Sequence, residues 1–92
     1  MIKSFRDKDT EALYAGKRVR RFEACRRQAI KRLDRIQAAT SLNDLGALRG
    51  NRLEALVGDR AGQHSIRIND QWRICFRWPK DGAEDVEIVD YH

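Results

Sequence analysis

The end of the sequence carries three side chains that transfer protons or form hydrogen bonds, Asp90, Tyr91 and His92. Histidine titrates near pH ~6.5, so a positioned imidazole can accept or donate a proton at neutral pH. A histidine at this place is also typical of a mobile tail, but a largely apolar segment over 86–89 directly precedes it. Alternation along such a strand puts Asp90 and Tyr91 on opposite faces unless a bulge intervenes. The cluster predicts proton transfer at a strand end.

Arg67 and Arg73 flank a predicted hairpin turn over 69–71. A three-residue loop pairs these two arginines and keeps apolar residues opposite each other, whereas a two-residue loop would pair apolar residues with charged ones. Like charges directly opposite each other are destabilising, so an anion is expected nearby. The candidates are the carboxylate of Asp90 and a phosphate of bound RNA.

Arginines beside a proton-transferring cluster fit RNA cleavage by internal transesterification. The ribose 2′-OH attacks its own 3′ phosphate, a base accepts its proton, an acid protonates the leaving 5′ oxygen, and cations stabilise the developing negative charge. This reaction needs no metal and no cofactor, and we expect none. The sequence has no G-x-x-x-x-G-K-[ST] phosphate loop, and its two histidines and two cysteines lack zinc-ligand spacing.

The two cysteines are predicted to play no part in catalysis. Cys25 lies on an apolar helical stripe and is expected in the core. Cys75 shares a face with Arg73 and could form an activated thiolate, but no histidine is assigned to it as a partner. Two cysteines cannot build a disulfide framework, and no apolar stretch follows the first residues as in a signal peptide. We therefore expect a cytoplasmic protein with reduced thiols.

The charge balance favours a polyanionic partner. The 92 residues, expected to form one domain over 1–92, hold 19 Lys and Arg against 14 Asp and Glu, for a net charge of +5. Nine cations and two anions lie between Lys17 and Arg35, while five acids and no cation lie between Asp81 and Asp90. The basic segment is either a solvated face or a nucleic-acid contact. No run of about 18 apolar residues exists, so no membrane contact is expected.

Hydrophobic periodicity predicts the elements that position these residues. We expect a short strand over 1–5, a helix capped by Asp9 or Thr10 that runs to Tyr14, and a long helix over 18–39. Thr40 and Ser41 are expected to end the long helix and to cap a short turn. The long helix should bury one apolar stripe, made of Phe22, Cys25, Ala29, Leu33 and Ile36.

From residue 53 onward the period changes to two, which predicts four strands. They are expected over 53–57, 65–68, 72–78 and from 86 to the end of the sequence, joined by short turns. Consecutive strands with short turns form an antiparallel meander. The fold class is therefore α+β, with two or three helices packed on one face of the sheet.

Three stretches resemble the HigB toxins of the RelE superfamily, also called plasmid-maintenance killer proteins. They are the run Leu56-Val57-Gly58-Asp59-Arg60-Ala61-Gly62, the run from Ser65 to Phe76, and the ending Asp90-Tyr91-His92. The resemblance covers nearly the whole chain. It implies a RelE-like compact microbial RNase fold and a ribosome-dependent endoribonuclease that cuts mRNA in the ribosomal A site without metal.

The resemblance also implies partners and roles. The partners would be the ribosome and a HigA antitoxin with a helix-turn-helix domain, through which alone the toxin would reach operator DNA. Arg73 would stabilise the scissile phosphate, while Asp90, Tyr91 and His92 would form the catalytic end. RNA contacts are expected from the basic helix and from the hairpin region: Arg20, Arg27, Lys31, Arg60, Arg67 and His64. His64 could instead be a packing residue.

Two positions depart from the pattern of this family. Members usually carry a lysine where this chain has Val57, and some carry a histidine where it has Glu54. Glu54 could act as a base, pair with Arg52, or serve solvation only. The loss of a phosphate-directed cation at residue 57 allows an alternative, a weakened or inactive relative that acts as a ribosome- or antitoxin-binding module.

Overall fold

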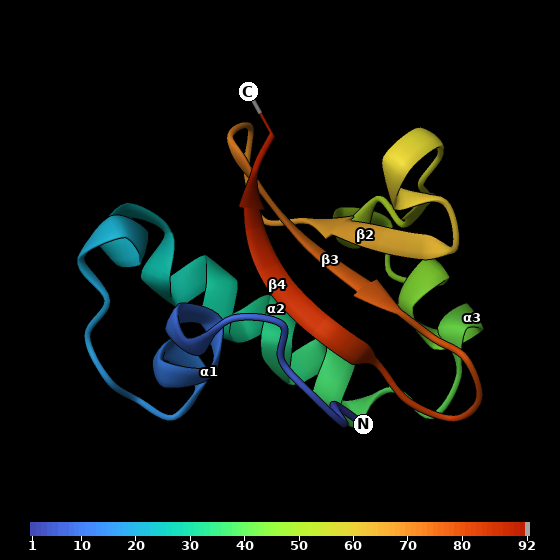
Figure 1. Ribbon diagram of the computed structural model, residues 1–92, viewed down its shortest axis with the longest axis horizontal. Coiled ribbons are helices and arrows are strands. Elements are labelled where there is room, and N and C mark those ends of the chain that lie inside the picture. Colours follow the sequence, from blue (N-terminus) through green and yellow to red (C-terminus); the bar gives the residue numbers. More distant parts are fainter. Residues whose placement is uncertain (92) are drawn as a thin grey trace.

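The computed structural model describes residues 1–91 and shows one antiparallel sheet packed against helices (Figure 1). The four strands lie in the order β1-β2-β3-β4, as expected for a meander. Their bounds are β1 Glu54–Ala55, β2 Gln63–Arg67, β3 Trp72–Arg77 and β4 Glu84–Asp90. The helices are α1 Lys8–Tyr14, α2 Arg26–Ala38 and α3 Leu42–Gly46, with short 3-10 helices η1 Arg20–Cys25, η2 Arg49–Asn51 and η3 Gly58–Arg60. The predicted α+β class is confirmed.

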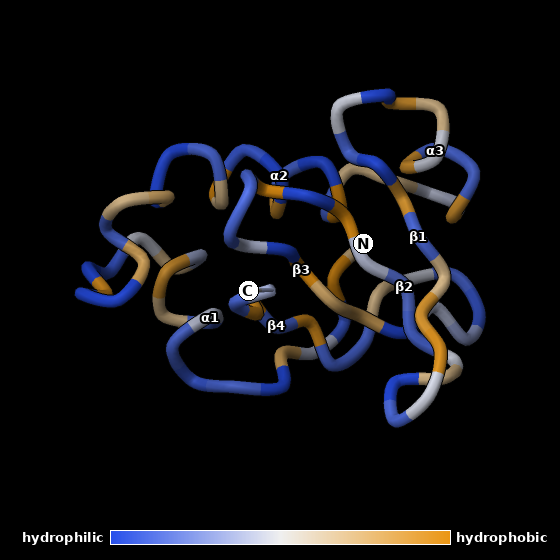
Figure 2. Tube along the Cα trace, turned by 90° about the horizontal axis from the view of Figure 1, so that it is seen from above, coloured by the Kyte–Doolittle hydropathy of each residue, from blue (hydrophilic) through white to orange (hydrophobic). Residues whose placement is uncertain are grey.

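The hairpin between β2 and β3 has the predicted register. Ile66 lies opposite Ile74 and Arg67 lies opposite Arg73. The loop closes where the N–H of Ile68 donates to the carbonyl of Trp72 at 2.9 Å. Because side chains alternate between the two faces of a strand, this register separates an apolar face from a polar one. Figure 2 shows a hydrophobic stretch in the middle of β3 between hydrophilic ends.

The apolar face of the sheet packs on α2, and the predicted stripe is confirmed. Ile66 and Ile74 are fully buried there, and the ring of Trp72 meets that of Phe22 edge-on at 5.5 Å. All five stripe residues have no exposed surface, namely Phe22, Cys25, Ala29, Leu33 and Ile36.

The prediction of one continuous helix over 18–39 is wrong, because residues 20–25 form η1 and α2 begins at Arg26. The N–H of Phe22 donates to the carbonyl of Val19, three residues back, which is the 3-10 pattern. In such a turn residues three apart lie above one another, so Phe22 and Cys25 still reach the core together.

The first residues run alongside β4, but they are not the regular strand that the sequence predicted. They form two isolated parallel bridges, Ile2 with Ala83 and Phe5 with Val86. Strict alternation would put Ile2 and Phe5 on opposite faces, yet both pack against the core. The N–H of Lys3 donates to the carbonyl of Ala83 at 2.7 Å, so this segment hydrogen-bonds part of the edge of β4.

Helix α1 begins two or three residues earlier than predicted, and it also packs against β4. Its cap is Asp7, whose carboxylate accepts from the N–H of Thr10 at 3.0 Å, rather than Asp9 or Thr10. Thr10 is buried, and its hydroxyl accepts from the N–H of Ile88 at 3.1 Å. Tyr14 joins α1 to α2 through a hydrogen bond to Asp34 at 2.9 Å. No helix of residues 1–91 is long and apolar enough to cross a lipid bilayer.

The turn after α2 is as predicted, whereas the first strand of the meander is shorter. Ser41 caps α3 in a capping box: its hydroxyl accepts from the N–H of Asp44, and the carboxylate of Asp44 accepts from the N–H of Ser41. Strand β1 contains only Glu54 and Ala55, so Val57 lies outside it, with 84% of its surface exposed. An apolar residue at that position has no core to fill, which makes it a substitution site of low structural cost.

Gly82 packs so closely against the N-terminal segment that one added methyl group is expected to destabilise the protein. A Cβ atom built there would lie 2.8 Å from the carbonyl oxygen of Met1 and 2.9 Å from the Lys3 side chain. We expect Gly82→Ala to lower the free energy of unfolding by about 1–3 kcal/mol, because the N-terminal segment must move away from β4. Urea denaturation followed by circular dichroism would measure it. Gly50→Ala is the control, because its Cβ would lie 3.8 Å from the nearest Arg35 atom, and equal stability losses would contradict the account.

Candidate active site

The polar face of the sheet carries a buried arginine. Arg73 is only 8% exposed, although it comes from a strand whose other face forms the core. Ser65 and Cys75 lie beside it on the same face and have no exposed surface. Burying a guanidinium is costly unless its donors are satisfied, so its partners indicate what this face is built to hold.

Neutral oxygen acceptors hold the guanidinium of Arg73. Its Nε donates to the hydroxyl of Ser65 at 2.8 Å, and its Nη2 donates to the backbone carbonyl of Arg52 at 2.7 Å. A longer contact joins Nη2 to the carbonyl of Ser65 at 3.4 Å. The carboxylate of Glu54 lies 3.9 Å from Nη2 as an ion pair at the exposed side. The anion predicted near the arginine pair thus comes from β1.

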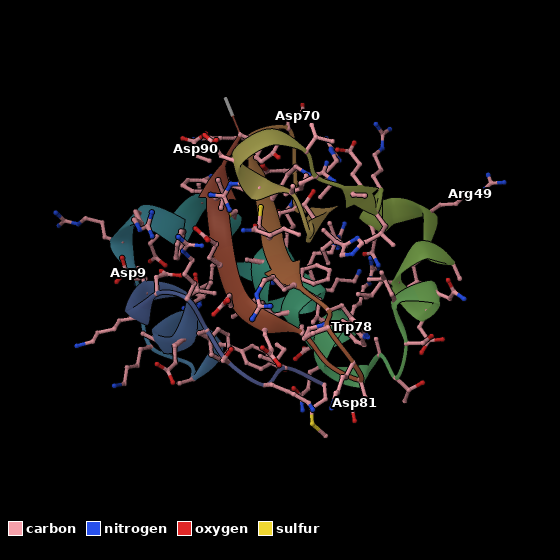
Figure 3. All side chains as sticks on the ribbon, turned by 45° about the vertical axis from the view of Figure 1, so that its right-hand side comes forward. Asp9, Arg49, Asp70, Trp78, Asp81 and Asp90 are labelled. Atoms are coloured by element: carbon pink, nitrogen blue, oxygen red, sulfur yellow. The ribbon has the colours of Figure 1, made fainter. Side chains whose placement is uncertain are left out.

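The predicted pairing of Arg73 with Asp90 is wrong. Asp90 lies opposite Trp72 in the β3–β4 register, and its carboxylate accepts from the side-chain amide of Gln71 at 3.1 Å. Because Trp72 and Arg73 point to opposite faces, Asp90 is directed away from the guanidinium. Figure 3 shows Asp90 and Asp70 at the same end of the sheet, beside the hairpin turn.

Tyr91 does reach Arg73. The guanidinium carbon lies 5.8 Å from the centre of the Tyr91 ring, within range of a cation–π contact. Tyr91 is 43% exposed, and its N–H donates to the carbonyl of Gln71, which anchors the chain end to the hairpin. The predicted separation of Asp90 and Tyr91 onto opposite faces therefore holds. His92, the third residue of the predicted cluster, lies outside the residues that the structure describes.

Arg67, opposite Arg73, has its own carboxylate. It pairs with Asp70 in the hairpin turn, three residues along the chain. The repulsion between the two opposed arginines is therefore offset separately for each: Asp70 pairs with Arg67, and oxygen acceptors surround Arg73. Asp70 is highly exposed, so this pair can open to another anion at little cost.

Arg60 lies on the same face, above the middle of the sheet. Its Nη1 donates to the side chain of Gln63 at 3.0 Å and lies 3.5 Å from the carboxylate of Glu87, which also pairs with Arg6 at 3.2 Å. Beneath them, burial raises the pKa of the Cys75 thiol above its usual value. The expectation that Cys75 is not a nucleophile agrees with this burial.

His64 faces the other side of the sheet from Arg73. It lies opposite Phe76, and the two rings are tilted by 31° with centroids 6.2 Å apart. The packing alternative for His64 agrees with this position, whereas stacking on RNA beside Arg73 does not.

The cations of the predicted basic helix belong to the helical layer rather than to the Arg73 face. Arg20, Arg27 and Lys31 are exposed, and none of them pairs with a carboxylate among residues 1–91. Arg32, also on α2, reaches the sheet instead: its Nε donates to the carbonyl of Arg67 at 3.2 Å, and burial lowers its pKa. The chain therefore presents two separate cationic regions, one on each side of the sheet.

Sequence reasoning missed the groups that position Arg73. The signal for Ser65 was present, because the predicted register puts it two residues from Arg67 on the Arg73 face. The signal for Arg52 was absent, because a backbone carbonyl in an irregular segment leaves no residue pattern. No group of three or more metal-ligand side chains gathers within the described part of the chain.

The fold is similar to that of a solved structure, and the sequence matches a known family. A chain of the YoeB–YefM complex from Staphylococcus aureus superimposes with a TM-score of 0.63, covering 100% of this chain and 98% of that one at 15% identity. That similarity concerns the fold: a RelE-like α+β protein. A family model described as the RelE-like toxin of type II toxin-antitoxin system HigB matches residues 3–92. The chain belongs to this family of HigB-like toxins.

Two curated relatives cover the full chain. Toxin HigB-1 of Vibrio cholerae serotype O1 is 38% identical over 94 residues, spanning 100% of this chain and 98% of the relative. Endoribonuclease HigB of Proteus vulgaris is 34% identical over 95 residues, spanning 100% of both chains. The resemblance to HigB toxins that the sequence motifs indicated is confirmed.

Proposed function

We propose that this toxin is an endoribonuclease that cuts mRNA in the ribosomal A site and thereby inhibits translation. Family membership and the relative named Endoribonuclease HigB support the activity. The observation that carries the proposal is the guanidinium of Arg73, held by fixed acceptors on a polar sheet face with Tyr91 beside it. A fixed cation next to a proton-transferring chain end is what transesterification of RNA requires.

In this mechanism Arg73 neutralises the charge that develops on the scissile phosphate. Tyr91 orients the RNA at the guanidinium, and His92 is the proton shuttle between the attacking 2′-OH and the leaving 5′ oxygen. Asp90 acts from the other side of the strand, where its contact with Gln71 holds the end of β4 against the hairpin turn. No metal or cofactor takes part in the proposed step.

The exposed cations of the helical layer are proposed to bind ribosomal RNA phosphates. Arg20, Arg27 and Lys31 are free to do so, while Arg60 and Arg67 would exchange a carboxylate for a phosphate. The proposed partner that neutralises the toxin is a HigA-type antitoxin with a helix-turn-helix domain, which would carry the toxin to operator DNA. With these proposed partners, the proposed location is the cytoplasm, without a membrane contact.

A second function is favoured by Val57. Its side chain is exposed, and it stands at the position where the family resemblance implies a phosphate-directed lysine. On this alternative the chain is a weakened or inactive toxin that still docks on the ribosome or on its antitoxin.

The test is cleavage of a defined mRNA on stalled ribosomes with an empty A site, mapped by primer extension. We expect cuts within the A-site codon, at least about tenfold faster than cuts in the same RNA without ribosomes, because the ribosome holds the scissile phosphate in place. Addition of EDTA at a concentration that leaves the ribosomes intact should not stop the reaction. Equal rates on free and ribosome-bound RNA would indicate a general RNase instead, and binding without cleavage would support the docking module.

A further inference from the structure

We propose that Ser65 is a positioning residue for Arg73, and that it acts together with the backbone carbonyl of Arg52. The two groups fix the guanidinium so that its Nη1 edge is the one presented to a substrate phosphate. This inference rests on the proposed function, because it assigns the means by which the phosphate-binding arginine is oriented.

The hydrogen-bond donors of Arg73 divide into an occupied set and an available set. Nε is taken by the hydroxyl of Ser65 at 2.8 Å, and Nη2 by the carbonyls of Arg52 and Ser65 at 2.7 and 3.4 Å. Within residues 1–91, neither hydrogen of Nη1 has an acceptor. A guanidinium has five donors in one plane, so three fixed contacts determine the direction of the remaining two.

The acceptors are themselves rigid. Ser65 has no exposed surface and lies in the middle of the sheet, paired with Glu54 on one side and Cys75 on the other. Arg52 has left-handed backbone angles of φ 45° and ψ 57°, an uncommon conformation for a residue with a side chain. That conformation turns its carbonyl toward Arg73, and strain of this kind is typical of functional sites.

This arrangement predicts how a phosphate meets the arginine. The side-on approach through Nε and Nη2 is closed, because both are occupied from the sheet side. The phosphate must therefore approach the end of the guanidinium, where the carboxylate of Glu54 and the ring of Tyr91 lie at its exposed border. A lysine at residue 73 could keep the charge but could not contact Ser65 and a phosphate with the same geometry.

The experiment compares Ser65→Ala with Ser65→Thr, which restores a hydroxyl in a residue type suited to strands. We expect Ser65→Ala to slow cleavage at saturating toxin by about tenfold to 100-fold, with little change in the toxin concentration that gives half the maximal rate. Ser65→Thr should recover most of that rate. Ser4→Ala is the matched control, because it also removes a hydroxyl acceptor, here for the Asp85 N–H, at the other end of β4.

A second measurement is independent of activity. In the wild-type protein, the Nε–H of Arg73 should exchange with water more slowly than those of exposed arginines in an arginine-selective NMR spectrum, and Ser65→Ala should abolish this protection. Fast exchange in the wild-type protein would overturn the proposal. So would a Ser65→Ala variant that cleaves at the wild-type rate while Arg73 variants do not, a result that leaves the proposed function intact. If the wild-type protein cleaves no RNA, the proposed function fails, and the exchange measurement alone decides the positioning contact.

Discussion

Replacement of Arg73 by glutamine is expected to reduce A-site mRNA cleavage by about 100-fold to 1,000-fold. A preorganised donor aimed at developing negative charge typically contributes this much to a rate, and here the donor is also a full cation. Glutamine retains a planar donor group but neither the charge nor the reach of Nη1. The measurement is the single-turnover cleavage rate on ribosomes programmed with one mRNA, followed by primer extension.

The control for this substitution is Arg77→Gln on the same strand. Arg77 is exposed and pairs with Glu84 and Asp85 at 2.9 Å each, so the change removes an equal charge outside the proposed site. We expect that variant to cleave within about threefold of the wild-type rate, because surface pairs of this kind contribute little. Arg73→Gln also leaves the buried Ser65 hydroxyl with a changed partner and should lower stability by about 1–3 kcal/mol, so folding is checked by circular dichroism. A well-folded Arg73→Gln protein with wild-type cleavage would remove Arg73 from the mechanism.

The parts of this fold that the sequence could predict are those governed by periodicity. The register of β2 and β3 followed from one argument, because a shift of one residue would have paired apolar residues with charged ones and broken the apolar face. The stripe of α2 followed in the same way. The start of α2 could not be predicted in this way. The 3-10 helix η1 buries Phe22 and Cys25 just as an α-helix would, so periodicity does not distinguish the two.

The parts that could not be predicted depend on contacts between segments far apart in the sequence. Arg73 was expected beside Asp90, a carboxylate of a neighbouring strand, or beside a phosphate of bound RNA. Of its acceptors, the Ser65 hydroxyl could have been inferred from the predicted register, whereas the carbonyl of Arg52 and the carboxylate of Glu54 come from segments about 20 residues earlier in the chain. The N-terminal segment likewise bonds to β4 in parallel, a pairing across some 80 residues that no local pattern indicates.

The difference between local patterns and contacts between distant segments also explains what the sequence could indicate about function. Residue types at the chain end and in the hairpin were sufficient to suggest RNA chemistry and to support a family resemblance. They could not show that Tyr91 and Arg73 meet while Asp90 turns away, because this depends on the face that each residue of β4 takes. Asp90 and Tyr91, adjacent in sequence, therefore lie on opposite faces of the sheet.

Replacement of Val57 by lysine is expected to raise the cleavage rate by about tenfold to 100-fold. One added hydrogen bond between a cation and a phosphate contributes about 1.5–3 kcal/mol, and each 1.4 kcal/mol corresponds to a factor of about ten. Val57 is 84% exposed and directly precedes η3, which carries Arg60, so the longer side chain can extend without disturbing the core. Single-turnover rates of the two proteins would be compared at two salt concentrations.

Val57→Gln separates charge from size in this comparison, because it adds a polar side chain without a cation. If the lysine acts on a phosphate, the gain appears only with Val57→Lys and shrinks as the salt concentration rises. Equal gains with both variants would mean that removal of an exposed apolar residue, rather than a restored cation, caused the effect. If wild type and Val57→Lys both bind ribosomes and neither cuts mRNA, the docking alternative is correct, since the sheet face would then hold Arg73 in place without using it. If the wild-type protein already cuts at the rate of the lysine variant, Arg73 and the chain end provide all the charge stabilisation that the reaction needs.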